Sequence, residues 1–162
     1  KLLEDDDAAV EVAVSETKIR FSVNGLMLTS KVIDGTFPDY TRVIPVGNER
    51  KMEVDAKDFA SAVDRVATVS QERSRAVKLM MEADRLGLSV NAPDAGSAAE
   101  ELVVAYGHEP MEIGFNAKYL TEIAQQIDRE NAVFLFSDAN APTLVREGDD
   151  ASAVYVVMPM RV

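Results

Sequence analysis

The chain has 162 residues, no cysteine, and a net charge of −11 from 28 acidic and 17 basic residues. The lack of cysteine excludes disulfides, thiolate zinc sites and cysteine nucleophiles, and is compatible with a reducing cytoplasm. The acidic balance disfavours broad contact with nucleic-acid phosphates, which needs surplus lysine and arginine. With 47% hydrophobic and 28% charged residues, the composition is that of an ordinary globular protein, and no apolar run is long enough to span a membrane.

The first part of the chain alternates apolar and polar residues, as strands with one buried face do. The alternation predicts three strands of an antiparallel meander, over Val10–Val14, Lys18–Val23 and Leu26–Val32. Asn24-Gly25 is a strong signal for a two-residue turn between the second and third strands. Turn-forming residues then fill 34–40, and we expect a domain boundary near Pro45.

In this interpretation, residues 1–45 are the end of one domain and residues 46–162 form a second one. The sequence opens on Lys1, and the apolar and acidic residues that follow resemble the end of a helix that begins upstream. We therefore expect the sequence to be a fragment of a longer protein.

From Lys51 onward, the order strand, helix, strands occurs twice. The first unit is predicted to contain a strand at Lys51–Val54, a helix over Ala56–Val69, and strands at Val77–Ala83, Gly87–Asn91 and Glu101–Ala105. The second is predicted to contain a strand at Met111–Gly114, a helix over Ala117–Ile127, and strands at Val133–Ser137, Thr143–Arg146 and Ala153–Val157. Similar residues recur about 60 positions apart, so we expect an α+β fold with an internal two-fold repeat.

Each predicted helix has one apolar and one polar face. The apolar positions are Phe59, Val63 and Val66 in the first helix, and Leu120, Ile123, Ala124 and Ile127 in the second. The polar positions are Lys57, Ser61, Asp64, Arg65 and Thr68, and then, each 61 positions later, Lys118, Glu122, Gln125, Gln126 and Arg129. Either these polar faces meet only solvent, or they face a partner. The residues alone leave both readings open.

Catalytic chemistry has little support in the sequence. The single histidine, His108, lies in a turn-forming segment, where a structural or solvent-facing role is expected. There is no Gly-x-Ser-x-Gly elbow and no phosphate-binding glycine loop. Residues 138–142 resemble the start of a calcium loop but lack its glycine and its closing glutamate. We expect no catalytic residue, no metal and no cofactor; a hydrolase or transferase would have to depend on His108.

Two apolar segments need a partner of some kind. Phe37–Val43 lies in the predicted linker, and Val156–Val162 closes the chain. Either the two segments pack against each other, or they line a groove in which Arg42 and Arg161 anchor the backbone or carboxylate of a bound partner.

Three motifs carry a resemblance to a known family. They are Phe37-Pro-Asp-Tyr-Thr-Arg-Val43, Met111-Glu-Ile-Gly-Phe-Asn116 with Tyr119, and Tyr155-Val-Val-Met-Pro-Met-Arg161. In this order they resemble the bacterial sliding clamp, the beta subunit of DNA polymerase III, over essentially the whole chain. The resemblance implies that residues 1–45 are the C-terminal part of the middle clamp domain and residues 46–162 the third domain.

The resemblance implies a ring that encircles duplex DNA and slides on it without reading sequence. Such a clamp is a non-catalytic subunit that makes the replicative polymerase processive, with antiparallel sheets outside the ring and two helices per domain lining its interior. The implied DNA-facing cations are sparse: Lys57, Arg65, Lys118 and Arg129. The implied ring is a cytoplasmic homodimer joined head to tail, with Val69 at the interface, and it uses no cofactor.

The resemblance also implies a groove between the middle and third domains for short peptides of the polymerase, the clamp loader and other clamp-binding proteins. The matching positions are Pro38, Arg42, Val43, Asn116, Tyr119, Val156, Val157, Met158, Pro159, Met160 and Arg161. Thr41 and Val162 depart from the commonest family residues. In a fragment we expect this groove to be incomplete and no topological link to circular DNA to form. The alternative function is a stand-alone peptide-binding α+β module.

Overall fold

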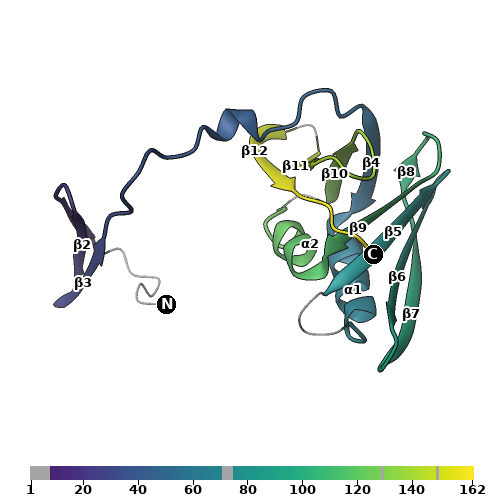
Figure 1. Cartoon of the computed structure of the whole chain (residues 1–162), viewed down its shortest axis with the longest axis horizontal. Helices are drawn as coiled ribbons and strands as arrows, with labels where there is room; N and C mark the ends of the chain where they lie inside the picture. Colours follow the sequence, from purple (N-terminus) through teal and green to yellow (C-terminus); the bar gives the residue numbers. More distant parts are fainter. Residues whose placement is uncertain (1–7, 71–74, 129, 149) are drawn as a thin grey trace. The chain divides into compact units, whose positions relative to one another are not determined.

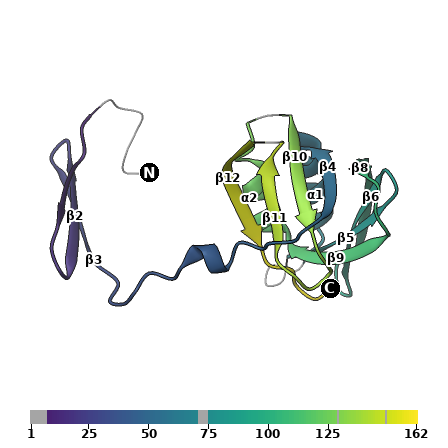
Figure 2. The same cartoon turned by 90° about the horizontal axis from the view of Figure 1, so that it is seen from above.

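The structure is a computed structural model that describes residues 8–70, 75–128, 130–148 and 150–162. The chain divides into two compact units, Lys1–Asp39 and Tyr40–Val162. Figures 1 and 2 show the elements of both units.

The first unit contains a three-stranded antiparallel sheet. Its strands are β1 (Glu11–Val14), β2 (Lys18–Val23) and β3 (Leu26–Lys31), in the order β1-β2-β3. Asn24 and Gly25 both have positive φ angles, 47° and 78°, as expected for the turn that best matches the twist of a hairpin. The predicted meander is confirmed.

The second unit begins with a short 3-10 helix, η1 (Tyr40–Arg42), and then contains the same set of elements twice. The first set is β4 (Arg50–Asp55), α1 (Ala56–Ala67), β5 (Ala76–Glu82), β6 (Arg85–Ala92) and β7 (Gly96–Val103). After the two-residue strand β8 (Ala105–Tyr106), the second set is β9 (Met111–Asn116), α2 (Ala117–Ala124), β10 (Asn131–Phe136), β11 (Thr143–Glu147) and β12 (Asp150–Val157). The predicted α+β fold with an internal repeat is confirmed.

The two sets exchange their first strands. One sheet has the order β12-β11-β10-β4-β8, and the other has the order β7-β6-β5-β9. Thus β4 pairs antiparallel with β10 of the second set, and β9 pairs antiparallel with β5 of the first. Since each sheet needs strands from both sets, neither set can complete a sheet on its own.

Both helices start in the same way at this exchange. The Ala56 amide that opens α1 donates to the Glu130 carbonyl at 2.8 Å, and the Ala117 amide that opens α2 donates to the Arg75 carbonyl at 2.8 Å. A capping side chain precedes each helix and satisfies one of its free amides. Asp55 Oδ1 accepts from the Asp58 amide at 2.8 Å, and Asn116 Oδ1 accepts from the Lys118 amide at 2.9 Å. The repeat therefore extends to individual hydrogen bonds.

The helices lie side by side and share one core with the two sheets (Figures 1 and 2). The predicted apolar positions of both helices are buried, except Ile123, which is partly buried against the core. Phe134 of β10 connects the halves, since its ring centroid lies 5.0 Å from that of Phe59 in α1. Among the described residues, no helix is long and apolar enough to cross a membrane.

Several predicted boundaries were wrong by two residues or more, including the ends of both helices and the start of β7. Helix α2 ends at Ala124 rather than Ile127, because the Gln126 and Ile127 amides bond the carbonyls three residues back and tighten the last turn. Helix α1 ends at Ala67 rather than Val69, because the Thr68 amide likewise bonds the carbonyl three residues back, that of Arg65. Strand β7 begins at Gly96, well before the predicted Glu101, because the small residues 96–99 pair with β6 despite their weak strand propensity.

Candidate binding surface at the C-terminal tail

The last five residues, Met158–Val162, form a C-terminal tail that connects the edges of the two sheets. Strand β12 is the edge of the five-stranded sheet and ends at Val157. The tail then runs to β9, the edge of the four-stranded sheet, where Met160 forms an isolated antiparallel bridge with Gly114. The Met160 amide donates to the Gly114 carbonyl at 2.8 Å. The yellow trace in Figure 1 follows this path.

A cavity of about 610 Å³ lies between α2 and β12, and we call it the α2–β12 cavity. Its lining is mainly apolar, with two polar side chains from α2 and the following turn. It is lined by Tyr119, Glu122, Ile123, Gln126, Val154, Tyr155, Val156, Val157 and Met158. Val157 is buried, whereas Tyr119 and Met158 are 54% and 64% exposed. An aromatic ring and a flexible methionine that remain exposed beside an apolar cavity are suited to holding an apolar side chain of a ligand.

A second cavity of about 460 Å³ lies along the end of the tail, and we call it the β9–tail cavity. Its lining is more polar than that of the α2–β12 cavity. It is lined by Lys78, Glu112, Ile113, Gly114, Ala139, Asn140, Pro159, Met160, Arg161 and Val162. Lys78 Nζ and Glu112 Oε2 form an ion pair at 3.1 Å across the β5–β9 pairing.

The structure brings most of the predicted groove residues to these two cavities. Tyr119, Val156, Val157 and Met158 line the α2–β12 cavity, and Pro159, Met160 and Arg161 line the β9–tail cavity. Asn116 caps α2 through its side chain. Arg42 and Val43, in and just after η1, line neither of the two, and Pro38 belongs to the first unit.

Sequence reasoning missed five residues that line the α2–β12 cavity: Glu122, Ile123, Gln126, Val154 and Tyr155. A signal was available for three of them. Glu122, Ile123 and Gln126 follow Tyr119 at intervals of three, four and seven residues, the spacing of one side of a helix, although Gln126 lies in the turn just after α2. Interpreting the second helix only as an apolar and a polar face concealed this third, lateral surface.

The polar positions of the two helices that the structure describes, all but residue 129, are exposed as predicted, but their cations are largely paired. The Arg65 guanidinium makes two hydrogen bonds to Glu100 of β7, one of them 2.9 Å from Nε to Oε2. These bonds raise the pKa of Arg65 and lower the pKa of Glu100. Lys118 Nζ lies 3.7 Å from Glu122 Oε1. None of the described ion pairs involves Lys57, and Arg129 lies outside the described residues.

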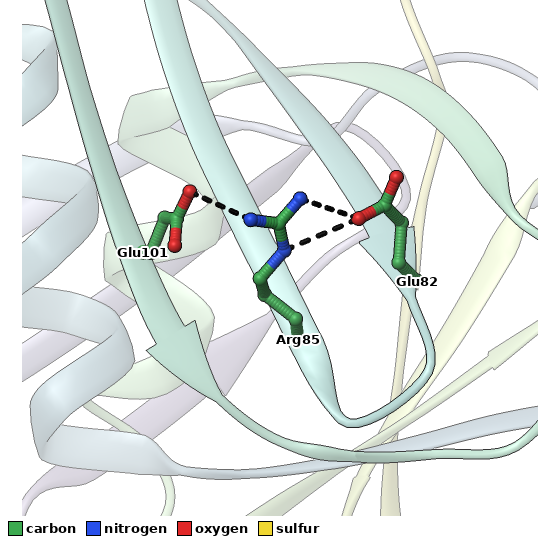
Figure 3. A network of polar contacts seen from close by, with 3 residues as sticks. All are labelled: Glu82, Arg85 and Glu101. Carbon is green, nitrogen blue, oxygen red and sulfur yellow. Dashed lines mark hydrogen bonds and ion pairs between the residues drawn. The ribbon is translucent and has the colours of Figure 1, made fainter.

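Glu101 follows Glu100 in β7 and points to the opposite face of the strand, as neighbouring residues of a strand do. This second carboxylate also has an arginine partner. Glu101 accepts a hydrogen bond of 3.0 Å from Arg85 of β6, and Arg85 also binds Glu82 of β5 (Figure 3). Hydrogen bonding to Glu82 is the largest cause that raises the pKa of Arg85. Val69, the predicted interface residue, is partly buried against the core of its own chain.

His108 has a structural contact. Its Nε2 accepts a hydrogen bond of 3.2 Å from the Lys51 amide, and its ring meets that of Tyr106 edge-on with centroids 5.5 Å apart. Within the described ranges, no group of three or more histidine, aspartate and glutamate side chains is arranged to hold a metal ion.

Comparison with known proteins gives the class and then the family. Among solved structures, the chain is similar to the DnaN sliding clamp (DNA polymerase III subunit beta) of Bartonella birtlesii bound to griselimycin. The TM-score is 0.85 at 55% identity, over 94% of this chain and 41% of that one. The fold is therefore that of a DNA clamp.

The family models give the same result. The model of the DNA polymerase III beta subunit, C-terminal domain, matches residues 41–161, and that of the central domain matches residues 1–39. The chain belongs to the DNA polymerase III beta subunit family.

The curated relatives that the chain matches are beta sliding clamps. The beta sliding clamp of Caulobacter vibrioides is 49% identical over 162 residues, and that of Escherichia coli K12 is 34% identical over 161 residues. These alignments cover 100% and 99% of this chain but only 44% of each relative, so the chain spans less than half the length of the curated relatives it matches.

Proposed function

We propose that this chain is part of a non-catalytic ring that encircles duplex DNA and tethers a bacterial replicative polymerase to it. Residues 1–45 would be the end of the middle domain of this clamp, and residues 46–162 its third domain. Membership in the family and the duplicated fold support the proposal. A cytoplasmic homodimeric ring, with Val69 near the subunit interface, belongs to the same proposal.

The polar faces of α1 and α2 would line the inside of this ring. Their pattern fits sliding, because Arg65 and Lys118 already have carboxylate partners and offer little attraction to phosphates. Many strong phosphate contacts would slow a clamp along DNA. Lys57, which takes part in none of the described ion pairs, is the strongest candidate for a phosphate contact, with Arg65, Lys118 and Arg129 contributing less.

The tail surface would bind the short peptides of the polymerase, the clamp loader and other clamp-binding proteins. The single observation that carries this proposal is the α2–β12 cavity, whose lining includes Tyr119 and the three consecutive residues Val156, Val157 and Met158. An apolar cavity with two polar side chains suits a peptide that presents leucine and phenylalanine after a glutamine. Pro38, Arg42, Val43, Asn116, Pro159, Met160 and Arg161 would extend the groove beyond this cavity.

Deletion of the tail tests the peptide site. Removing Met158–Val162 takes Met158 from the lining of the α2–β12 cavity and Pro159–Val162 from that of the β9–tail cavity, but no residue of β12, so the fold should persist. In titration calorimetry with a synthetic peptide containing Gln, Leu and Phe in that order, we expect the native protein to bind and the deletion variant to show no measurable binding.

The matched control is Val103→Ala, which shortens an exposed side chain of β7 outside the lining of both cavities. It should bind the peptide like the native protein. Unchanged affinity in the deletion variant, with circular dichroism that shows an intact fold, would remove the tail from the site.

A further inference from the structure

We propose that Gly114 is a positioning residue for the peptide site. Because glycine has no side chain, the C-terminal tail can lie against the backbone of residue 114, and this contact fixes the position of Met158 in the lining of the α2–β12 cavity. The inference rests on the peptide-binding function proposed above. Gly114 lies in β9, outside the lining of the α2–β12 cavity, so it would act on that cavity through the tail.

The tail has few other attachments. Among the described residues, the Gly114–Met160 bridge, with its Met160 N–H to Gly114 carbonyl hydrogen bond, is the one strand-like pairing that joins Met158–Val162 to the rest of the unit. Val157, immediately before the tail, is 3% exposed and paired with Thr143 in the sheet. The tail is therefore fixed at Val157 and at Met160, and the position of Met158 between these two points depends on both.

The bridge depends on the absence of a side chain at residue 114. A Cβ atom there would lie 2.5 Å from the Met160 carbonyl oxygen and 2.4 Å from Cγ1 of Val162. The Val162 side chain is 57% exposed and can turn away, but the Met160 oxygen is part of the backbone. Alanine at this position must therefore push the tail off β9. The glycine is needed for space rather than for an unusual backbone angle, since Gly114 has no positive φ.

Displacing Met160 should also move Met158, which is two residues earlier and 64% exposed. Val157 cannot follow, because it is packed in the core. The tail would then pivot between Val157 and Met160, and the wall of the α2–β12 cavity would move away from Tyr119.

The test compares Gly114→Ala with Gly87→Ala, using two measurements. Gly87 lies in β6 of the same four-stranded sheet, and a Cβ there would meet its nearest neighbour at 3.7 Å, an ordinary contact. The first measurement is hydrogen exchange of the Met160 amide by NMR without any peptide. We expect exchange about tenfold faster or more in Gly114→Ala than in the native protein, and no change in Gly87→Ala.

The second measurement is the dissociation constant of the synthetic Gln-Leu-Phe peptide. We expect binding about tenfold weaker in Gly114→Ala, a loss of roughly 1.4 kcal/mol, with native affinity in Gly87→Ala. Native-like Met160 exchange in folded Gly114→Ala would overturn the proposal whatever the peptide does. Faster exchange with unchanged affinity would overturn the link to the peptide site. If the native protein itself binds no peptide, the proposed function fails, while the exchange measurement still decides whether Gly114 holds the tail.

A second variant covers the case in which Gly114→Ala does not fold. Val162→Ala removes both γ carbons that lie over Gly114, and Val162 is 57% exposed, so the core is not affected. We expect Met160 exchange about threefold faster in this variant because the tail loses packing over β9 but keeps its bridge. Native-like exchange in Val162→Ala would show that the tail does not depend on its contact with Gly114.

Discussion

The last strands of the two duplicated sets, β7 and β12, occupy equivalent edge positions but differ in chemistry. Both are edge strands, and an open strand edge tends to pair with other chains. Strand β7 carries carboxylates that arginines bind on both faces, Glu100 by Arg65 and Glu101 by Arg85. Strand β12 instead continues into an apolar tail that covers the edge of β9. The difference shows that one duplicated framework can produce a charged edge strand in one set and an edge strand with an apolar extension in the other.

The largest effect is expected where the two sets are inseparable. Phe134 of β10 is 1% exposed and packs on Phe59 of α1, so Phe134→Ala removes a ring shared by both sets. We expect the free energy of unfolding to fall by about 3–5 kcal/mol, in a single transition seen by both circular dichroism and fluorescence of the tyrosines. The control Val103→Ala, at an exposed position of β7, should stay within about 0.5 kcal/mol of the native value. Two separate transitions of the second unit would show that the sets unfold independently.

The helix caps test how similar the two sets are energetically. Asp55→Ala and Asn116→Ala each remove one hydrogen bond to the first turn of a helix. Each should lower the free energy of unfolding by about 1 kcal/mol in denaturant titration. Asp55→Asn keeps an acceptor at the cap and should recover most of the loss. If only one of the two variants lowers the free energy of unfolding, the two caps share their geometry but do not contribute equally to stability.

The smallest effect concerns the charged edge. Because Arg65 lowers the pKa of Glu100 in the folded protein, this carboxylate stabilises the fold above the ordinary glutamate value of 4.5, and the contribution is lost as the pH falls through the lowered pKa. Glu100→Gln should therefore lower Tm slightly at neutral pH, and the difference from the native protein should disappear in acid. A difference in Tm that persists unchanged at low pH would contradict this assignment.

The same variant also tests the DNA-facing side of the proposal. Glu100→Gln releases Arg65 on the polar face of α1, so DNA retention at low salt should increase slightly. Glu101→Gln removes the same charge from the opposite face of β7 and should not change DNA retention. Equal increases in both variants would attribute the effect to net charge alone.

Local patterns in the sequence predicted the elements well but not their arrangement. The apolar spacing of Phe59, Val63 and Val66 is enough to define a helix face, and Asn24-Gly25 is enough to define a turn. The exchange of β4 and β9 between the two sets could not be predicted in this way, because strand pairing depends on residues far apart in the sequence. Strand β7 was predicted too short because its first residues are small and derive their strand conformation from β6.

The candidate site was predicted in a similarly uneven way. The residues of β12 and the tail were found through a motif, since a run of Val, Met and Pro at the end of a chain is unusual. Glu122 and Gln126 were assigned only to the polar face of the second helix, although they also line the α2–β12 cavity. Gly114 was quoted as part of a motif without a role, because the tail that needs its bare backbone is distant in sequence.

The strand exchange also determines when the protein can fold during its synthesis. Strand β4 leaves the ribosome well before its partner β10, which begins only at Asn131, after all of the first set and after β9 and α2 of the second. Until then, β4 can pair only with the two-residue strand β8, and the apolar residues Met52 and Val54 lie in an incomplete sheet. Such non-local pairing slows folding and prolongs exposure to aggregation. A nascent chain stalled before Asn131 should therefore be protease-sensitive and bound by chaperones, and protection should appear abruptly once β10 has emerged.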